Sequence, residues 1–194
     1  MRFLFLGTAT LIFTLWIACS FAEPNQYQDI LGQKGAVLVL SQDDLFRQSN
    51  YGKEISRIFK SKQENLLVEG RKIEQKFILE EKKLTQKRLI LQPEDFQKLA
   101  DDFDRRVEKT RESRSEKDRM LQQNFITWKK KFAQIVLPIV RDIMTETKSL
   151  LVIDTSTRGL IYDQKIDITE IVIQKLNEDF IMNPGKIDRI ININ

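Results

Sequence analysis

The longest feature of the hydrophobic pattern is a proline-free stretch from Lys53 to Gln92, built from residues that favour helix. Its large apolar residues recur at steps of seven and four, which is typical of one face of a helix. This stripe consists of Phe59, Leu66, Ile73, Phe77, Leu84 and Leu91. Polar residues interrupt it at several turns, so the pattern predicts a long helix with a narrow apolar seam.

Pro93 predicts the end of this helix, because a residue that precedes proline avoids helical geometry. Pro93, Glu94 and Asp95 make a favourable first turn for a second helix. Its apolar positions pause over Glu108 to Arg119 and resume from Leu121 to Ile143 at steps of three and four. Pro138 is expected to bend this helix or loosen one hydrogen bond. The two runs predict a helical hairpin over residues 51–149, with its tip near 89–96.

Short apolar runs on either side of the hairpin predict strands. They are Ala36–Leu40, Leu150–Asp154 and Leu160–Tyr162. Ser41 can cap a short helix whose Leu45 and Phe46 point inward, and Asp167 with Glu170 forms a capping box for an amphipathic helix. These segments predict a β-rich body from residues 36–50 plus 150–181. The tail, residues 182–194, carries no interpretable pattern.

The predicted fold class is α+β, mainly α, with a long hairpin that projects from a small β-sheet body. Such a body has only about 45 residues, and a domain below about 60 residues buries little surface. A few strands from one chain also leave an unpaired sheet edge. We therefore expect an obligate oligomer in which several chains share the sheet.

The N-terminus has the features of a signal peptide covering residues 1–22. Arg2 precedes an apolar run from Phe3 to Ala18, and small residues at Ser20 and Ala22 fit the cleavage pattern. This run is shorter than the ~20 residues of a membrane-spanning helix. Cys19 leaves open a lipoprotein anchor as the alternative. Residues 23–35, which are polar and contain Pro24, predict a flexible leader.

Charge is divided unevenly along the chain. Residues 53–150 hold 24 Lys and Arg against 17 Asp and Glu, whereas residues 23–52 and 151–194 together hold 7 against 11. The hairpin is therefore basic and the body acidic. The chain has no histidine, and its one cysteine lies in the predicted signal peptide. We expect no enzymatic activity, no metal site and no cofactor, because the usual general base and thiolate are missing and no phosphate-binding glycine loop occurs.

Several segments, taken in order, resemble the Skp (OmpH-like) family of periplasmic chaperones. They are Ala36–Ser41, Tyr51–Lys53, Ile135–Val140, Leu151–Asp154, Asp167–Glu170 and Ile173–Asn177, together with Tyr162. The resemblance covers about residues 36–178, and the order and spacing of the segments carry it. It implies a homotrimer whose strands form a shared barrel, with three hairpins around a cavity that holds unfolded outer-membrane proteins without ATP. The longer leader and the bulky tip Leu89–Leu91 depart from the family pattern.

Three sets of residues are candidates for this function. Apolar contacts with unfolded polypeptide are predicted at Phe77, Ile78, Leu84, Leu89, Ile90, Leu91, Phe96, Leu99 and Phe103. Electrostatic contacts with clients, lipopolysaccharide or an anionic membrane surface are predicted at Arg71, Lys72, Lys76, Lys82, Lys83, Lys87 and Arg88. The core of the trimer is predicted at Val37, Val39, Leu151, Ile153 and Ile161.

Other interpretations fit some of the same residues. Leu84 and Phe103 also fit a role in pairing the two helices, and the basic residues also fit a solvated helix face. A structural or tethering coiled-coil protein of the envelope is the main alternative function, although its heptads should continue through residues 108–119. Nucleic-acid binding needs only Lys and Arg, but the export signal argues against it.

Overall fold

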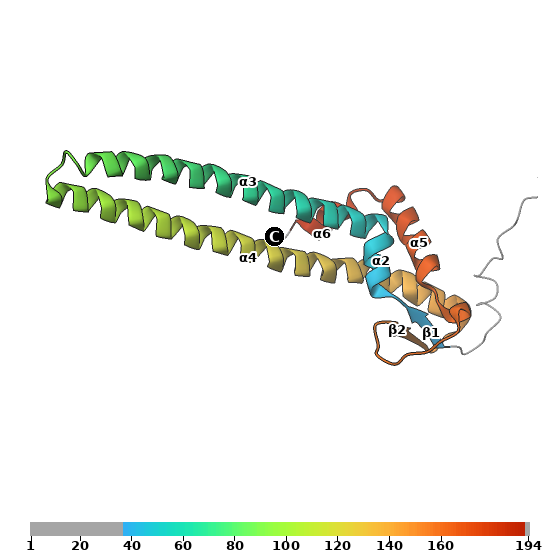
Figure 1. Ribbon diagram of the computed structural model, residues 1–194. Coiled ribbons are helices and arrows are strands. Elements are labelled where there is room, and N and C mark those ends of the chain that lie inside the picture. The colour runs from blue at the N-terminus through green and yellow to red at the C-terminus, as the bar shows by residue number, and fades with distance from the viewer. Residues whose placement is uncertain (1–36, 193–194) are drawn as a thin grey trace, which may run out of the picture.

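The structure is a computed structural model that describes residues 37–192. Its dominant feature is the predicted hairpin, formed by α3 (Asn50–Lys87) and α4 (Pro93–Thr147), which lie side by side and extend far beyond the body (Figure 1). The two helices have 38 and 55 residues. The fold is therefore mainly helical, as predicted.

The start of each hairpin helix has a clear physical cause. The Ser49 hydroxyl accepts a hydrogen bond from Gly52 N at 3.3 Å and caps α3. Pro93 occupies the first turn of α4 with Glu94 and Asp95, as the sequence predicts. Residues 88–92 make the turn between the helices and are called the tip below. Pro138 lies inside α4 and does not end the helix, which continues to Thr147.

The small sheet has two parallel strands, β1 (Val37–Leu40) and β2 (Leu151–Asp154). Val37 is paired with Leu151, and the register continues to Leu40 opposite Asp154. Parallel strands need a long crossover, and here the whole hairpin serves as that connection. Ser41 caps α2 (Gln42–Gln48) as predicted, since its hydroxyl accepts from Asp44 N at 3.2 Å.

Two local predictions were wrong. Residues 160–162 form no strand, because no ladder partner lies beside them in the described part of the chain, and Ile161 is 96% exposed. The chain instead passes through a short 3-10 helix, η1 (Gln164–Ile166). The capping box is also absent: Asp167 Oδ1 accepts from Thr169 N at 2.8 Å, one residue earlier than a box requires.

The buried core lies at the base of the hairpin, where β1 and helices α2 to α6 meet. Tyr51 and Ile55 from α3 and Trp128 and Phe132 from α4 share one cluster with Leu38 of β1. Helix α5 (Thr169–Met182) adds Ile171, Val172, Ile173 and Leu176 to it. The packed body therefore includes both hairpin bases and is larger than the two segments from which we inferred an oligomer.

The last helix, α6 (Lys186–Ile191), falls in the tail for which the sequence showed no pattern. It turns back from α5 and packs against α3 and α4 near the base (Figure 1). Among residues 37–192 no helix combines the length and apolar character needed to span a membrane. The predicted signal peptide and leader lie outside the described residues.

Candidate functional site

Four of the nine candidate apolar residues lie between the two helices of the hairpin. Phe77 and Phe103 meet edge to face with ring centroids 5.7 Å apart. Leu84 and Phe96 are also half-buried, and the Arg88 guanidinium lies 5.8 Å from the Phe96 ring centre. Phe77 and Phe103 therefore pack α3 against α4, which is the alternative that the sequence left open for Phe103.

The other five candidates are exposed, and three of them lie in the tip. Leu89 and Ile90 are 87% and 83% exposed, while Ile78, Leu91 and Leu99 are 46%, 37% and 37% exposed. Leu89 to Leu91 lie in the turn between the two helices, and their exposure shows that neither helix covers them. The tip therefore presents a small apolar surface to solvent.

Sequence reasoning missed further exposed aliphatic residues on α3. Leu79 is 60% exposed, and Leu67 and Val68 are 46% and 42% exposed. The run Phe77-Ile78-Leu79 contained the signal, since only one of three successive helical residues can face the seam. Phe77 takes that place, so its two neighbours remain outside.

The middle of the hairpin is held by polar groups, where the sequence lacks apolar residues from Glu108 to Arg119. Lys117 Nζ lies 2.6 Å from Glu69 Oε1, and Arg106 Nη1 donates to Glu80 Oε2 at 3.0 Å. These hydrogen bonds from Arg106 hold the pKa of the Glu80 carboxyl below its usual value. Exposed ion pairs of this kind contribute little stability, so the middle of the hairpin is weakly held.

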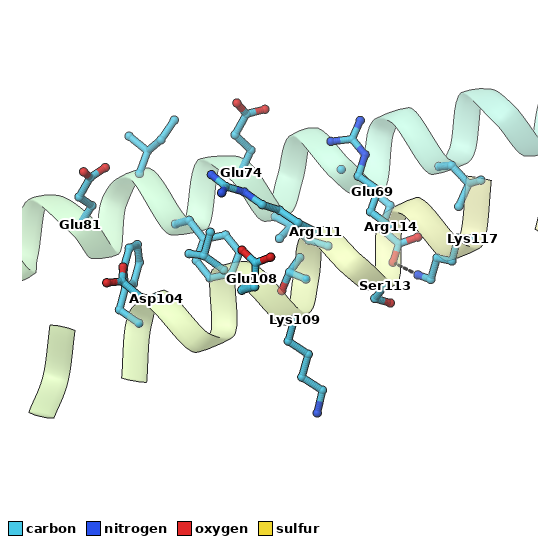
Figure 2. A pocket seen from close by; sticks show the side chains of 18 residues that line it. Glu69, Glu74, Glu81, Asp104, Glu108, Lys109, Arg111, Ser113, Arg114 and Lys117 are labelled. Carbon is cyan, nitrogen blue, oxygen red and sulfur yellow. Dashed lines mark hydrogen bonds and ion pairs between the residues drawn. The ribbon is translucent and has the colours of Figure 1, made fainter. Parts of the chain in front are cut away.

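A cavity of about 830 Å³ opens between α3 and α4 beside the Glu69–Lys117 ion pair (Figure 2). Gly70 forms part of its wall, and Arg114 reaches across from α4 to lie against it. Carboxylates of both helices, among them Glu74 and Glu108, line it together with Arg111 and with apolar side chains such as Ile73. Its charges are mixed, so we assign no ligand to it.

All seven candidate cations are exposed, and none takes part in the ion pairs found among residues 37–192. Lys72, Lys76, Lys83 and Lys87 follow one another at steps of four, seven and four, so they share one face of α3. We call these four residues the basic strip. The nearby acids Glu69 and Glu80 form their ion pairs with cations of α4, so none of the four lysines of the strip has an ion-pair partner among residues 37–192.

The five residues predicted for the trimer core occupy different environments. Val39 is 1% exposed and packs within its own chain, and Ile153 is half-buried. Val37 and Leu151, which are paired across the sheet, are 41% and 50% exposed, and Ile161 is 96% exposed. Leu150, missed by the sequence reasoning, is 80% exposed beside Leu151. Apolar surface is thus available at the open side of the sheet.

The described part of the chain contains no group of His, Cys, Asp and Glu side chains placed to hold a metal ion. Burial, and then the hydrogen bond to Asp179, raise the pKa of the Tyr51 hydroxyl. Tyr51 lies in the body, away from every candidate surface of the hairpin. Its raised pKa therefore results from packing in the core and does not indicate a functional site.

Comparison with known proteins matches most of the chain to one family. The sequence profile of the family described as "Outer membrane protein (OmpH-like)" matches residues 36–176. A crystal structure of a candidate outer membrane chaperone (OmpH-like) from Caulobacter crescentus CB15 aligns with a TM-score of 0.62 and 16% identity, covering 74% of this chain and 85% of that one. The likeness in structure shows the same fold. Comparison with curated protein sequences finds no match.

Proposed function

Since the chain belongs to the OmpH-like family of outer membrane proteins, whose members are periplasmic chaperones and not enzymes, we propose that it is an ATP-independent holdase. It would bind unfolded outer-membrane proteins between the arms of a homotrimer and prevent their aggregation. The observation that carries the proposal is the exposed apolar tip at the end of a long, basic hairpin. A monomeric protein without an apolar ligand gains nothing from exposing Leu89 and Ile90 there.

Weak contacts at several places suit a holdase, because a client must be released again without ATP. Burying one large apolar side chain contributes roughly 1.5–3 kcal/mol, and part of that is lost in ordering the client. Three arms that act on one chain raise the effective affinity through multivalency. The tip and the exposed residues of α3, Ile78 and Leu79, supply such contacts without a deep pocket.

The basic strip supports the electrostatic part of the proposal. Four lysines on one face of α3 produce a positive field that attracts acidic segments and that salt screens. Arg71, Lys82 and Arg88 add to it from neighbouring positions. The same cations suit the phosphates of lipopolysaccharide or an anionic membrane surface, which we propose as further partners.

The open sheet supports assembly into a trimer with a shared barrel. β2 pairs only with β1 among the described residues, so its other edge offers unpaired backbone groups. Val37, Leu150, Leu151 and Ile161 provide exposed apolar area on the same part of the body. We propose that neighbouring chains cover this area, and that export proceeds through cleavage of residues 1–22. A lipid anchor at Cys19 is the alternative fate of that segment.

An aggregation assay tests the holdase. A denatured outer-membrane β-barrel protein diluted into buffer should stay soluble when the purified chain is present in excess, in the absence of ATP. Sedimentation of the chain alone should give the mass of a trimer. A tethering coiled-coil protein would leave client aggregation unchanged, and that result would remove the proposal.

A further inference from the structure

The C-terminal segment, residues 183–192, covers a surface between the bases of α3 and α4. It is called the strap, and the surface beneath it is called the base groove. Ile190 is only 2% exposed, and Ile187 and Ile191 pack against the same core. The spacing of these three isoleucines places them on one face of α6. The strap lies beyond residues 36–176, which the family profile matches.

Side chains of α4 hold the strap through its main chain. Trp128 Nε1 donates to the carbonyl oxygen of Ile191 at 3.1 Å. Lys131 Nζ donates to the carbonyl oxygens of Arg189 at 2.9 Å and Asn192 at 3.0 Å. Every polypeptide carries such carbonyls, so these contacts recognise a segment of chain without reading its side chains. The sequence of a bound segment matters only where its side chains pack on the apolar surface of the groove, as the isoleucines of the strap do.

The strap is a short element that an exposed turn connects to the rest of the fold. A helix of six residues is unstable by itself in water, so α6 depends on its contacts with the base groove. An exposed turn, Asn183-Pro184-Gly185, separates it from α5. Helix α5 has its own buried residues, including Val172 and Leu176. Besides the contacts with α4, Lys186 Nζ donates to Asp179 Oδ1 of α5 at 2.6 Å, so opening of the strap also breaks this ion pair. A local opening of this kind costs less free energy than unfolding of the whole domain.

We propose that the base groove is a binding site for a short, aliphatic segment of an unfolded polypeptide, and that the strap is its intramolecular competitor. A suitable segment carries aliphatic residues at positions i, i+3 and i+4, as Ile187, Ile190 and Ile191 do. Trp128 and Lys131 bind its main-chain carbonyls. The identity of the ligand as a client rests on the proposed function, whereas the existence of the groove does not.

The competitor has two physical consequences. A covered groove keeps Trp128 and its apolar neighbours from water when no client is present, which avoids association between empty chaperone molecules. The apparent affinity of the groove falls in proportion to the fraction of time that it is open. A client that already binds the tip has a high local concentration and can displace the strap.

Trp128 provides a direct reporter of groove occupancy. The chain has two tryptophans, Trp16 and Trp128, so a full-length chain with Trp16→Phe has a single one. Two such proteins are compared, one complete and one ending at Asn183. The truncated protein should show red-shifted emission, and a synthetic peptide with the sequence of residues 186–194 should reverse the shift. An unfolded β-barrel protein, added next, should displace the peptide.

Two controls separate binding from general stability. A peptide with aspartate in place of both Ile187 and Ile190 should leave the emission unchanged. Lys131→Met in the truncated chain should weaken peptide binding by about tenfold, since it removes hydrogen bonds from a charged donor. Its circular dichroism spectrum should stay unchanged. If truncation unfolds the body, the full-length chain with Ile190→Asp releases the strap while keeping it attached, and the same peptide titration applies.

The results distinguish this site from the proposed function. If the truncated protein is folded but binds no peptide, the base groove is not a binding site, whether or not the protein suppresses aggregation. If the peptide binds but the unfolded client does not displace it, the ligand of the groove is not a client segment. If the protein binds the peptide but does not suppress client aggregation, the proposed holdase function is wrong. The ligand of the groove is then not a client either.

Discussion

Gly52, in the first turn of α3, lies so close to the carbonyl group of Phe46 that a β-carbon at position 52 would be 1.6 Å from the Phe46 oxygen. The oxygen belongs to the backbone of α2, which Ser41 and Ser49 fix at its two ends. Neither helix can move away without disturbing the core around Leu45 and Tyr51. The angle at which the hairpin leaves the body therefore depends on this glycine.

Gly52→Ala should lower the free energy of unfolding by about 3 kcal/mol or more, because a backbone atom cannot yield to the added methyl group. Gly70→Ala provides the matched control. Its β-carbon would meet only the end of the flexible Arg114 side chain, at 2.8 Å, and alanine favours helix by roughly 0.5–1 kcal/mol. This variant should be slightly more stable than the parent. Urea denaturation measures both, and equal stability of the two variants would contradict the argument.

Leu89→Asp combined with Ile90→Asp should weaken client binding by at least about tenfold, since two exposed apolar contacts of roughly 1.5–3 kcal/mol each are lost. The free energy of unfolding should change by less than about 0.5 kcal/mol, because the tip contributes little to the core. Phe77→Ala is the contrasting variant. It lies in the seam, so it should lower stability more than it lowers client binding. Aggregation assays and urea denaturation together separate the two effects. A tip variant that still prevents client aggregation as the parent does would show that the tip is not a client-binding surface.

The long helices, Pro93 at the start of α4 and the Ser41 cap were predictable because each depends on residues close in sequence. The strand at residues 160–162 was wrongly predicted because a strand needs a partner, and local pattern does not reveal one. The strap was missed because α6 is held by Trp128 and Lys131, which lie about sixty positions away. For the candidate surfaces, the sequence indicated the exposed tip but did not separate the seam residue Phe77 from the exposed Leu79.

Leu151→Asp should dissociate the proposed trimer while each chain remains folded, because Leu151 is half-exposed and lies at the open side of the sheet. Val39→Asp should instead unfold the chain, since Val39 is buried in the core of its own subunit and an unpaired buried charge costs several kcal/mol. Sedimentation reports the mass and circular dichroism reports the fold. A Leu151→Asp protein of unchanged mass would show that the sheet is not the assembly surface. A folded Val39→Asp chain would show that the core of the subunit does not require Val39.

Reversal of the basic strip, with glutamate at Lys72, Lys76, Lys83 and Lys87, should slow client capture at low salt. At about 1 M salt the Debye length is about 3 Å, so the difference from the parent should nearly vanish. The control reverses four exposed cations near the base and in the body, at Lys130, Arg141, Lys148 and Arg158, and produces the same change in net charge. Stopped-flow capture of a labelled unfolded client measures the rate. Equal slowing by both variants would mean that net charge, and not the strip, attracts the client.

Asp179 links α3, α5 and the strap, because it accepts hydrogen bonds from Tyr51 at 2.9 Å and Lys186 at 2.6 Å. Burial by itself would raise the pKa of its carboxyl, but the hydrogen bonds from Lys186 and Tyr51 outweigh it and lower the pKa. A carboxyl with a lowered pKa in the folded state stabilises the fold at neutral pH, and this contribution is lost as pH falls below the ordinary aspartate range.

Asp179→Asn should therefore reduce the free energy of unfolding by on the order of 1 kcal/mol at pH 7. The difference between the variant and the parent should shrink as pH falls through the lowered pKa, because the parent then loses the same charged interactions. Urea denaturation at a series of pH values measures it. Glu178→Gln, an exposed neighbour on α5, is the control and should change stability little at any pH. If the Asp179→Asn difference stayed constant down to strongly acidic pH, the carboxylate would not be the group that joins these three helices.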